Sequence, residues 1–244
     1  MTPPPPTPAF EIYLLGEVDF DDAIRLQRRL VYDLGDRGGG ALILCEHPAI
    51  ITVGRSGSRA YIRPDDHELR DLGIPVRWVN RGGGAVLHLP GQLIAYLALP
   101  LDQLGLNLND YLDGLHRALI GVLAEFDLRG ATHPGMAGVY LGHARVASVG
   151  VAVNRWIASY GLTLNVNPSL DPFAMLDEPG HGGYRLHQTS MEARRQRPTL
   201  MAKVREALLR QLETVFGLER HHLYTDHPLI RRKARPHAYV ASLR

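Results

Sequence analysis

The segment that most constrains this chain is residues 80–101, NRGGGAVLHLPGQLIAYLALPL. It places three consecutive glycines after Arg81, and His88 follows four residues past the last glycine. Glycine lets the backbone adopt positive φ and approach a ligand closely, and the arginine and histidine place polar groups beside that backbone. Pro90 and Gly91 then separate two apolar runs, which is typical of a turn. The segment predicts a strand, a turn and a second strand, either around a ligand or as a plain glycine-rich hairpin.

Composition limits the classes of protein to which the chain can belong. Its 244 residues, 45% of them hydrophobic, suffice for a sizeable core in one large domain or two small ones. A formal net charge of +2, without basic runs interleaved with aromatic residues, does not favour nucleic acid as a partner. No segment has the apolar length of a membrane span, and the N-terminus lacks the pattern of a signal peptide. We therefore expect a cytoplasmic protein that acts without nucleic acid or membrane.

Cysteine content narrows the chemistry further. Cys45 is the only cysteine, so a disulfide within the chain is excluded and a cysteine-based zinc site is not expected. Because Cys45 ends the apolar run ALILC, we expect a buried and unreactive thiol.

Predicted strands and helices alternate along the rest of the chain. Residues 1–9 are rich in proline, which neither joins a helix interior nor donates a backbone hydrogen bond, so we expect a disordered arm. Apolar residues at helical spacing predict helices, and short apolar runs between turn residues predict strands. The predicted helices cover residues 19–34, 108–128 and 199–216, and the predicted strands cover 11–15, 41–45, 50–53, 74–79, 135–141, 145–153 and 156–166.

This alternation indicates a single α/β domain over residues 10–217, without internal repeats. Residues 168–197 carry prolines, glycines and histidines without periodicity, and a loop of that length is usually functional or mobile. Residues 218–244 form a basic, weakly patterned C-terminal tail.

Five blocks of the sequence together resemble one family. DFDDAIRLQRRLVYDL at 19–34 is similar to the family's first helix, and LILCEHPAIITVGR at 42–55 to its EHP strand pair. RGGGAVLHLPGQL at 81–93, PGMAGVY at 134–140 and VASVGVAVNRWIASYGLTLNV at 146–166 follow in the family's order. Over roughly residues 10–217 the chain resembles the lipoyl(octanoyl) transferases of the biotin and lipoate protein ligase superfamily.

The resemblance implies a fold, a reaction and partners. The fold is an α/β (α+β) domain with one layer of sheet and one of helices. The family moves an octanoyl group from acyl carrier protein to a lysine on lipoyl domains of 2-oxoacid dehydrogenases or on the glycine cleavage H protein. Its mechanism uses a cysteine that becomes an acyl thioester and a lysine that helps to activate it, because a nearby cation favours the thiolate. No cofactor and no metal are expected.

A substrate site is implied in the same way. Glycine-rich walls suit a narrow apolar slot for a fatty chain. The candidate catalytic residues are Arg145 and His88, as groups that stabilise the oxyanion during transfer. The substrate-binding positions are Arg81, Gly82, Gly83, Gly84, Ala85, Val86, Leu87 and His88, then Ser148, Val149 and Gly150, and finally Gly161, Leu162 and Thr163.

Three positions depart from the family's pattern. Arg145 stands where the family has its lysine, and Pro179 where it has its cysteine. Arginine stays protonated and cannot accept a proton, and proline has no nucleophile. Leu89 replaces the glycine of the family's His-Gly-Pro and is expected to add an apolar side chain near the pocket. His181, close to Pro179, is a further candidate acyl carrier or general base, although a plain surface histidine is the simpler interpretation.

Three functions remain open on the sequence alone. The first, which the family favours, is octanoyl transfer by a modified mechanism such as direct transfer. The second is a non-catalytic relative that binds an acyl chain, an acyl carrier protein or a lipoyl domain, which accounts directly for the loss of both catalytic residues. The third is an ATP-dependent, lipoate ligase-like enzyme, because the run from Gly82 to Val86 resembles the glycine run of those ligases. They too rely on a lysine near the position of Arg145.

Overall fold

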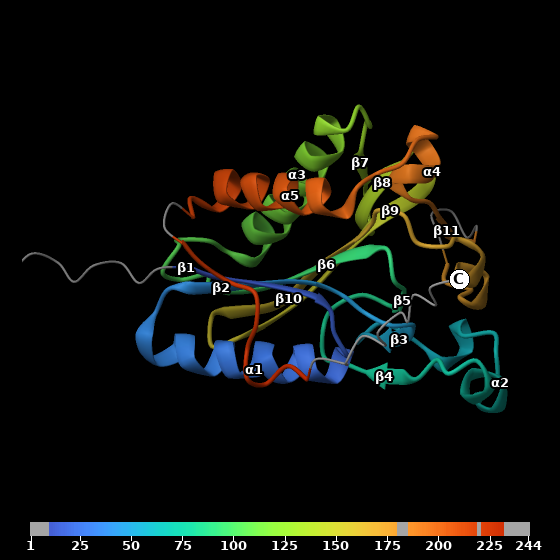
Figure 1. Ribbon diagram of the computed structural model, residues 1–244, viewed down its shortest axis with the longest axis horizontal. Helices are drawn as coiled ribbons and strands as arrows, with labels where there is room; N and C mark the ends of the chain where they lie inside the picture. The colour runs from blue at the N-terminus through green and yellow to red at the C-terminus, as the bar shows by residue number, and fades with distance from the viewer. Residues whose placement is uncertain (1–9, 180–184, 219–220, 232–244) are drawn as a thin grey trace, which may run out of the picture.

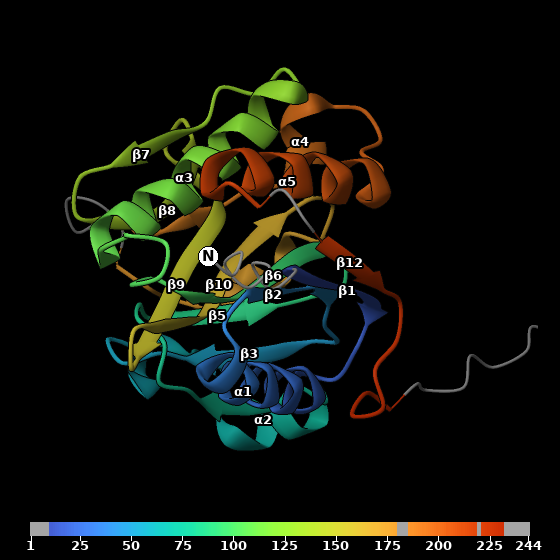
Figure 2. The ribbon, with the colours of Figure 1, turned by 90° about the vertical axis from the view of Figure 1, so that its left-hand side faces the viewer.

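The computed structural model describes residues 10–179, 185–218 and 221–231. A mixed sheet crosses the centre of the molecule, with α3 (Leu108–Glu125) and α5 (Met201–Phe216) on one face and α1 (Phe20–Arg37) on the other (Figures 1 and 2). The α/β class predicted from the sequence is confirmed. Helices cover both faces of the sheet, whereas the resemblance implied a single layer of helices. The proline-rich residues 1–9 and most of the C-terminal tail lie outside the described residues.

The large sheet combines parallel and antiparallel pairs. Its strands run in the order β12-β1-β2-β6-β10-β9-β8-β7, and β11 pairs with β9. The pairs of β1 with β12, β1 with β2 and β9 with β11 are parallel, and the others are antiparallel. The strands are β1 (Phe10–Glu17), β2 (Gly40–Glu46), β6 (Gln92–Pro100), β7 (Ala131–His133), β8 (Met136–Leu141), β9 (Ala144–Asn154), β10 (Ile157–Asn165), β11 (His187–Gln188) and β12 (His221–Tyr224).

The central strands are buried on both faces. Side chains alternate along a strand, so Leu42 and Leu44 of β2 pack in the core beneath α3 and α5, while Ile43 and Cys45 pack against α1. This double burial explains why ALILC is continuously apolar. On the inner face of α1, Phe20, Ile24, Leu30 and Leu34 are buried in this core, and Val31 is partly buried.

The glycine-rich segment joins this sheet to a second, smaller one. In the smaller sheet β3 (Ile50–Val53) lies between β4 (Val76–Trp78) and β5 (Ala85–His88). β6 follows β5 after the turn, yet it lies in the large sheet between β2 and β10. The predicted strand, turn and strand are therefore confirmed, but the hairpin alternative is wrong. The two strands of the EHP motif, β2 and β3, likewise lie in different sheets.

The turn at Pro90 and Gly91 depends on close packing. Gly91 has a φ of 90°, and a Cβ there would lie 2.8 Å from the nitrogen of Pro168, so only glycine fits. Its N–H donates to Oε2 of Glu46 at 2.9 Å, which ties the turn to the end of β2. The acidic residue of the EHP motif thus has a structural role here.

Other connections contain short elements. The polar stretch after β3 holds a 3-10 turn, η1 (Arg59–Tyr61), and a short helix, α2 (Asp66–Asp71). The segment expected to be irregular, 168–197, contains η2 (Asp171–Met175), β11 and α4 (Met191–Arg195). Strand β12 in the tail was missed because its residues are all exposed and show no alternation of burial. Across the described ranges, no helix is both long enough and apolar enough to cross a membrane.

Candidate functional site

A narrow cavity lies between the glycine-rich segment of the smaller sheet and strands β9 and β10 of the large sheet. Its volume is about 30 Å³, room for little more than one or two water molecules. An acyl chain therefore requires the walls to move apart. The lining residues are Phe20, Arg81, Val86, His88, Tyr96, Ser148, Val149, Gly150, Tyr160, Gly161, Leu162 and Thr163.

Nine of these twelve lining residues belong to the set predicted from the sequence, and Phe20, Tyr96 and Tyr160 were missed. The other predicted positions, from Gly82 to Ala85 and Leu87, belong to the same segment but do not line the cavity. Leu89 does not either: it packs in the core of the smaller sheet with Leu87. The apolar side chain expected near the pocket at Leu89 thus does not form part of the cavity wall, because the chain turns between β5 and β6 at this point.

Arg81 holds the glycine-rich segment in shape. Arg81 is 7% exposed, and its guanidinium donates to the carbonyl oxygens of Gly82 (2.9 Å), Gly84 (3.2 Å) and Thr52 (3.0 Å), and to Oγ1 of Thr52 (2.8 Å). Burial lowers the pKa of Arg81 to about 10, which still leaves the group charged at neutral pH. The Gly82 N–H also donates to the carbonyl of Val151 at 2.8 Å, so the segment is fixed to β9.

Glycines at the cavity permit close backbone contact. A Cβ on Gly150 would lie 2.9 Å from the carbonyl oxygen of Gly82, and one on Gly161 would lie 2.3 Å from that of Ala95. Gly150 thus lets the glycine-rich segment lie on β9, and Gly161 lets β10 lie against β6. Gly150 and Gly161 therefore allow the backbone segments that form the cavity walls to approach each other, and their lack of a side chain also leaves space in the cavity.

Two buried histidines lie side by side, and one of them, His88, lines the cavity. The ring of His47 is 5.8 Å from that of His88, centroid to centroid. His47 Nδ1 lies 2.7 Å from the carbonyl of Val18, which can only accept, so this nitrogen carries the hydrogen. Its Nε2 then accepts from the Tyr96 hydroxyl at 2.8 Å. Burial lowers the pKa of His47 to about 4, and burial together with His47 and Arg81 lowers the pKa of His88 well below its usual value.

A loss of stability in mild acid follows from His47. Its pKa is about 6.5 in the unfolded chain and about 4 in the folded protein, so unfolding takes up a proton between these values. The free energy of unfolding therefore falls as the pH drops, by roughly 2 kcal/mol from this group between about pH 7 and about pH 5. His88 acts in the same direction. Urea titrations at both pH values measure the loss, which should be smaller by that amount in His47→Gln; an equal loss in both proteins would contradict this assignment.

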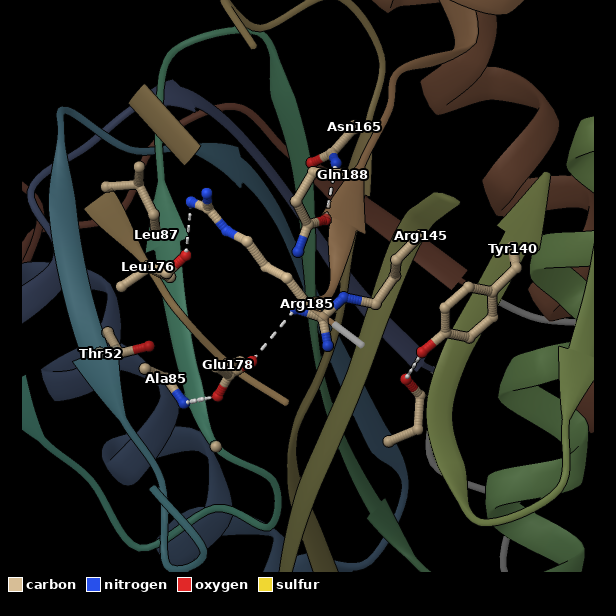
Figure 3. Close-up of polar contacts among 12 residues, drawn as sticks. Thr52, Ala85, Leu87, Tyr140, Arg145, Asn165, Leu176, Glu178, Arg185 and Gln188 are labelled. Atoms are coloured by element: carbon tan, nitrogen blue, oxygen red, sulfur yellow. Dashed lines mark hydrogen bonds and ion pairs between the residues drawn. The ribbon is translucent and has the colours of Figure 1, made fainter. Parts of the chain in front are cut away.

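Arg145 and Glu178 form a buried ion pair beside the glycine-rich segment (Figure 3). Arg145 Nη2 lies 3.5 Å from Glu178 Oε2, and each side chain is 10% exposed. Glu178 Oε1 accepts a hydrogen bond from the Ala85 N–H. With the Gln188 amide oxygen turned toward the guanidinium, that oxygen accepts from Arg145 Nε (3.2 Å) and Nη2 (2.8 Å). Arg145 is thus engaged by β11 and by Glu178, and it does not line the cavity.

Glu178 was missed from the sequence, although a signal was present. An acid directly precedes Pro179, and Arg145 lies in an apolar strand, where a buried cation needs an acidic partner. Gly84 accommodates this carboxylate, because a Cβ there would lie 1.9 Å from Glu178 Oε1. Glu178 therefore connects the loop before Pro179 with both β5 and β9.

No thiol is available at the cavity. Pro179 is exposed and forms an isolated bridge with Arg185. Cys45 is 2% exposed within the core against α1, and burial, with a smaller contribution from Glu46, raises the pKa of its thiol far above the usual value. The expectation that Cys45 is buried is confirmed. His181 lies outside the described residues. Within the described ranges, no group of histidine, cysteine and acidic residues is arranged to hold a metal ion.

Comparison with known proteins decides the family. Residues 19–213 match the model of the lipoyl protein ligase A/B catalytic domain. The chain belongs to this family. The octanoyltransferase of Syntrophobacter fumaroxidans is 37% identical over 177 residues, which cover 72% of this chain and 78% of the relative. That of Citrifermentans bemidjiense is 38% identical over 178 residues, covering 73% and 84%. The resemblance to lipoyl(octanoyl) transferases is therefore confirmed.

Solved structures of the family share the fold at lower identity. Lipoate-protein ligase A bound with ATP has a TM-score of 0.71 at 15% identity, covering 90% of this chain and 89% of that one. A bipartite lipoate protein ligase from Thermoplasma acidophilum, studied with its E2 lipoyl domain, has a TM-score of 0.68 at 16% identity, covering 89% and 86%. At these identities the two structures support the fold alone.

Proposed function

We propose that the protein is an octanoyltransferase of the lipoate pathway that works by direct transfer. The octanoyl group passes from the thioester of an acyl carrier protein to a lysine of a lipoyl domain, with no acyl-enzyme in between. The observation that carries this proposal is that the cavity retains Arg81, His88 and the glycine-bearing strands while the only thiol of the chain is buried elsewhere. Membership of a family whose curated relatives are named octanoyltransferases supports the substrate.

Direct transfer needs no reacting group other than the thioester of the carrier and the lysine of the acceptor. The neutral lysine amine of the acceptor attacks the thioester carbonyl, a C–N bond forms, and the C–S bond breaks. The carrier thiol leaves as a thiolate and takes up the proton that the amine loses. The carbonyl oxygen gains negative charge in the transition state, and a fixed donor at the cavity wall stabilises it there. We assign this role to His88. Binding both substrates at one site supplies the remaining rate advantage, because it fixes the two reacting atoms together.

Arg145 has a supporting role in this proposal. Its guanidinium is taken up by Glu178 and Gln188, and Glu178 in turn holds the N–H of Ala85. We assign to Arg145 the positioning of Glu178, and through it of the glycine-rich segment. The roles of the other predicted substrate-binding residues are part of the same proposal: Ser148 to Gly150 and Gly161 to Thr163 line the same cavity as His88.

A transfer assay in purified components tests the function. Octanoyl acyl carrier protein and a lipoyl domain are mixed with the protein, with and without ATP, and the octanoylated domain is measured by mass. We expect transfer without ATP, unchanged in Cys45→Ala and absent when the acceptor lysine of the lipoyl domain is replaced by arginine. Transfer that requires ATP and free octanoate would support a ligase instead. Binding of the carrier or the domain without any transfer would support a non-catalytic relative.

A further inference from the structure

Hydrogen bonding at Thr52 is the starting point. Thr52 lies on β3, is fully buried, and faces the buried His88 of β5 across the smaller sheet. Arg81 Nη2 donates to Thr52 Oγ1 at 2.8 Å, and a guanidinium can only donate. The other partner of the hydroxyl is His88 Nε2, at 3.1 Å. Among the described residues, the hydroxyl hydrogen therefore has one acceptor, the lone pair of Nε2.

This arrangement determines the state of the His88 ring. A neutral imidazole carries one hydrogen, so an Nε2 that accepts from Thr52 leaves the hydrogen on Nδ1. The opposite arrangement, with Nε2 donating to Thr52, leaves the hydroxyl hydrogen without an acceptor and Nδ1 without a donor. The Nε2–H form thus leaves two buried polar groups without hydrogen-bond partners, whereas the Nδ1–H form leaves only one. The orientation of the Thr52 hydroxyl is itself set by the permanent charge of Arg81.

Nδ1 of His88 is the group left over. It is buried and has no hydrogen-bond partner among the described residues. Buried polar atoms without partners are rare in folded proteins, and one on a residue that lines a cavity indicates a ligand atom. An N–H donor complements an oxygen acceptor. The carbonyl oxygen of an acyl thioester, which becomes negative during transfer, is such an acceptor.

We propose that Thr52 is a positioning residue that keeps the hydrogen of His88 on Nδ1, where it donates to the carbonyl oxygen of the acyl thioester. Thr52 does not line the cavity and acts through His88. The charge of Arg81 thus orients the Thr52 hydroxyl, the hydroxyl sets the tautomer of His88, and His88 donates to the substrate. The inference rests on the proposed function for the identity of the substrate, but the state of the ring is a property of the protein alone.

The ring state is tested first, in the protein without substrate. Long-range ¹H–¹⁵N correlation spectra distinguish Nδ1–H from Nε2–H imidazoles, and His88→Ala assigns the signals of this ring. We expect Nδ1–H in the unaltered protein and in Thr52→Ser, which keeps the hydroxyl. Thr52→Val, which has nearly the same shape but no hydroxyl, should shift the ring toward Nε2–H or a mixture. An Nε2–H ring in the unaltered protein, or no change in Thr52→Val, overturns the inference.

Transfer rates then test the consequence. Thr52→Val should lower kcat by about 10²-fold with little change in KM, because the lost donor acts mainly on the transition state. Thr52→Ser should stay within a few-fold of the unaltered protein. Arg81 retains its bond to the Thr52 backbone carbonyl in both variants, so both should fold, with a lower urea midpoint in Thr52→Val because its buried hydroxyl is lost. A cooperative urea transition, with transfer assayed well below its midpoint, excludes misfolding as the cause of a lower kcat. An unchanged kcat in Thr52→Val with a shifted ring overturns the role. Since the ring state is measured without substrate, a failure of octanoyl transfer itself counts against the proposed function and not against the Thr52–His88 contact.

Discussion

Replacing Arg145 by methionine is expected to lower the free energy of unfolding by about 3 kcal/mol or more, because it strands a buried carboxylate. Glu178 is 10% exposed at its side chain, and without the guanidinium its remaining hydrogen-bond donor is the Ala85 N–H. Methionine keeps much of the volume of the arginine stem, so the loss reports the charge and not a cavity. Urea denaturation at neutral pH measures the change.

A double-mutant cycle supplies the control. Glu178→Gln alone leaves the Arg145 charge unpaired, and the double variant Arg145→Met with Glu178→Gln removes both charges. The double variant should be more stable than the sum of the two single losses predicts, by on the order of 1 kcal/mol or more, because neither charge is left alone. Strictly additive losses would mean that the two side chains do not interact, and the structural role assigned to Arg145 would be wrong.

Gly150→Ala should lower octanoyl transfer by about 10²-fold, since a shift of about 1 Å at the reacting groups has that effect. The added Cβ would lie 2.9 Å from the carbonyl of Gly82 and 3.3 Å from Cδ of Arg81, so the glycine-rich segment must move away from β9. That movement breaks the bond from the Gly82 N–H to Val151 and displaces the wall that carries His88. The octanoyl transfer assay measures it.

Gly35→Ala is the matched control for this change. Its Cβ would lie 3.9 Å from Ile157 Cδ1, an ordinary contact, and Gly35 lies within α1, where alanine favours the helix. This variant should keep the full transfer rate and gain a little stability. A Gly150→Ala protein that transfers at the unaltered rate would show that close contact between Gly82 and β9 is not needed for activity.

The sequence was most informative where a local pattern decides the structure. Helix α5 ends at Phe216, where the predicted helix ends, and Gly217, with a φ of 67°, caps it. The strand, turn and strand of the glycine-rich segment are also local and were predicted. Which strands pair is not local: β5 and β6 share the same apolar character, yet they lie in different sheets, and the turn at Gly91, packed against residues 167–168, connects them.

In the candidate site, too, some residues could be predicted from local sequence and others could not. Residues within the recognisable blocks, such as His88 and Gly150, were found from the sequence because their neighbours carry the resemblance. Thr52 and Tyr96 lie in runs that look entirely structural, and their polar groups matter only through partners on other strands. Glu178 acquires its role from a contact with Arg145, 33 residues away along the chain. Such partnerships depend on tertiary contacts that no periodicity encodes.

The central claim is that transfer proceeds without an acyl-enzyme, and intact mass spectrometry tests it most directly. The protein is incubated with octanoyl acyl carrier protein alone, quenched in acid and weighed; lipoyl domain is then added to the same mixture. The account predicts an unmodified protein in the first step and octanoylated lipoyl domain in the second. A hydroxylamine-labile octanoyl adduct on the protein that disappears when the lipoyl domain is added, at Cys45 or at any other residue, would contradict it.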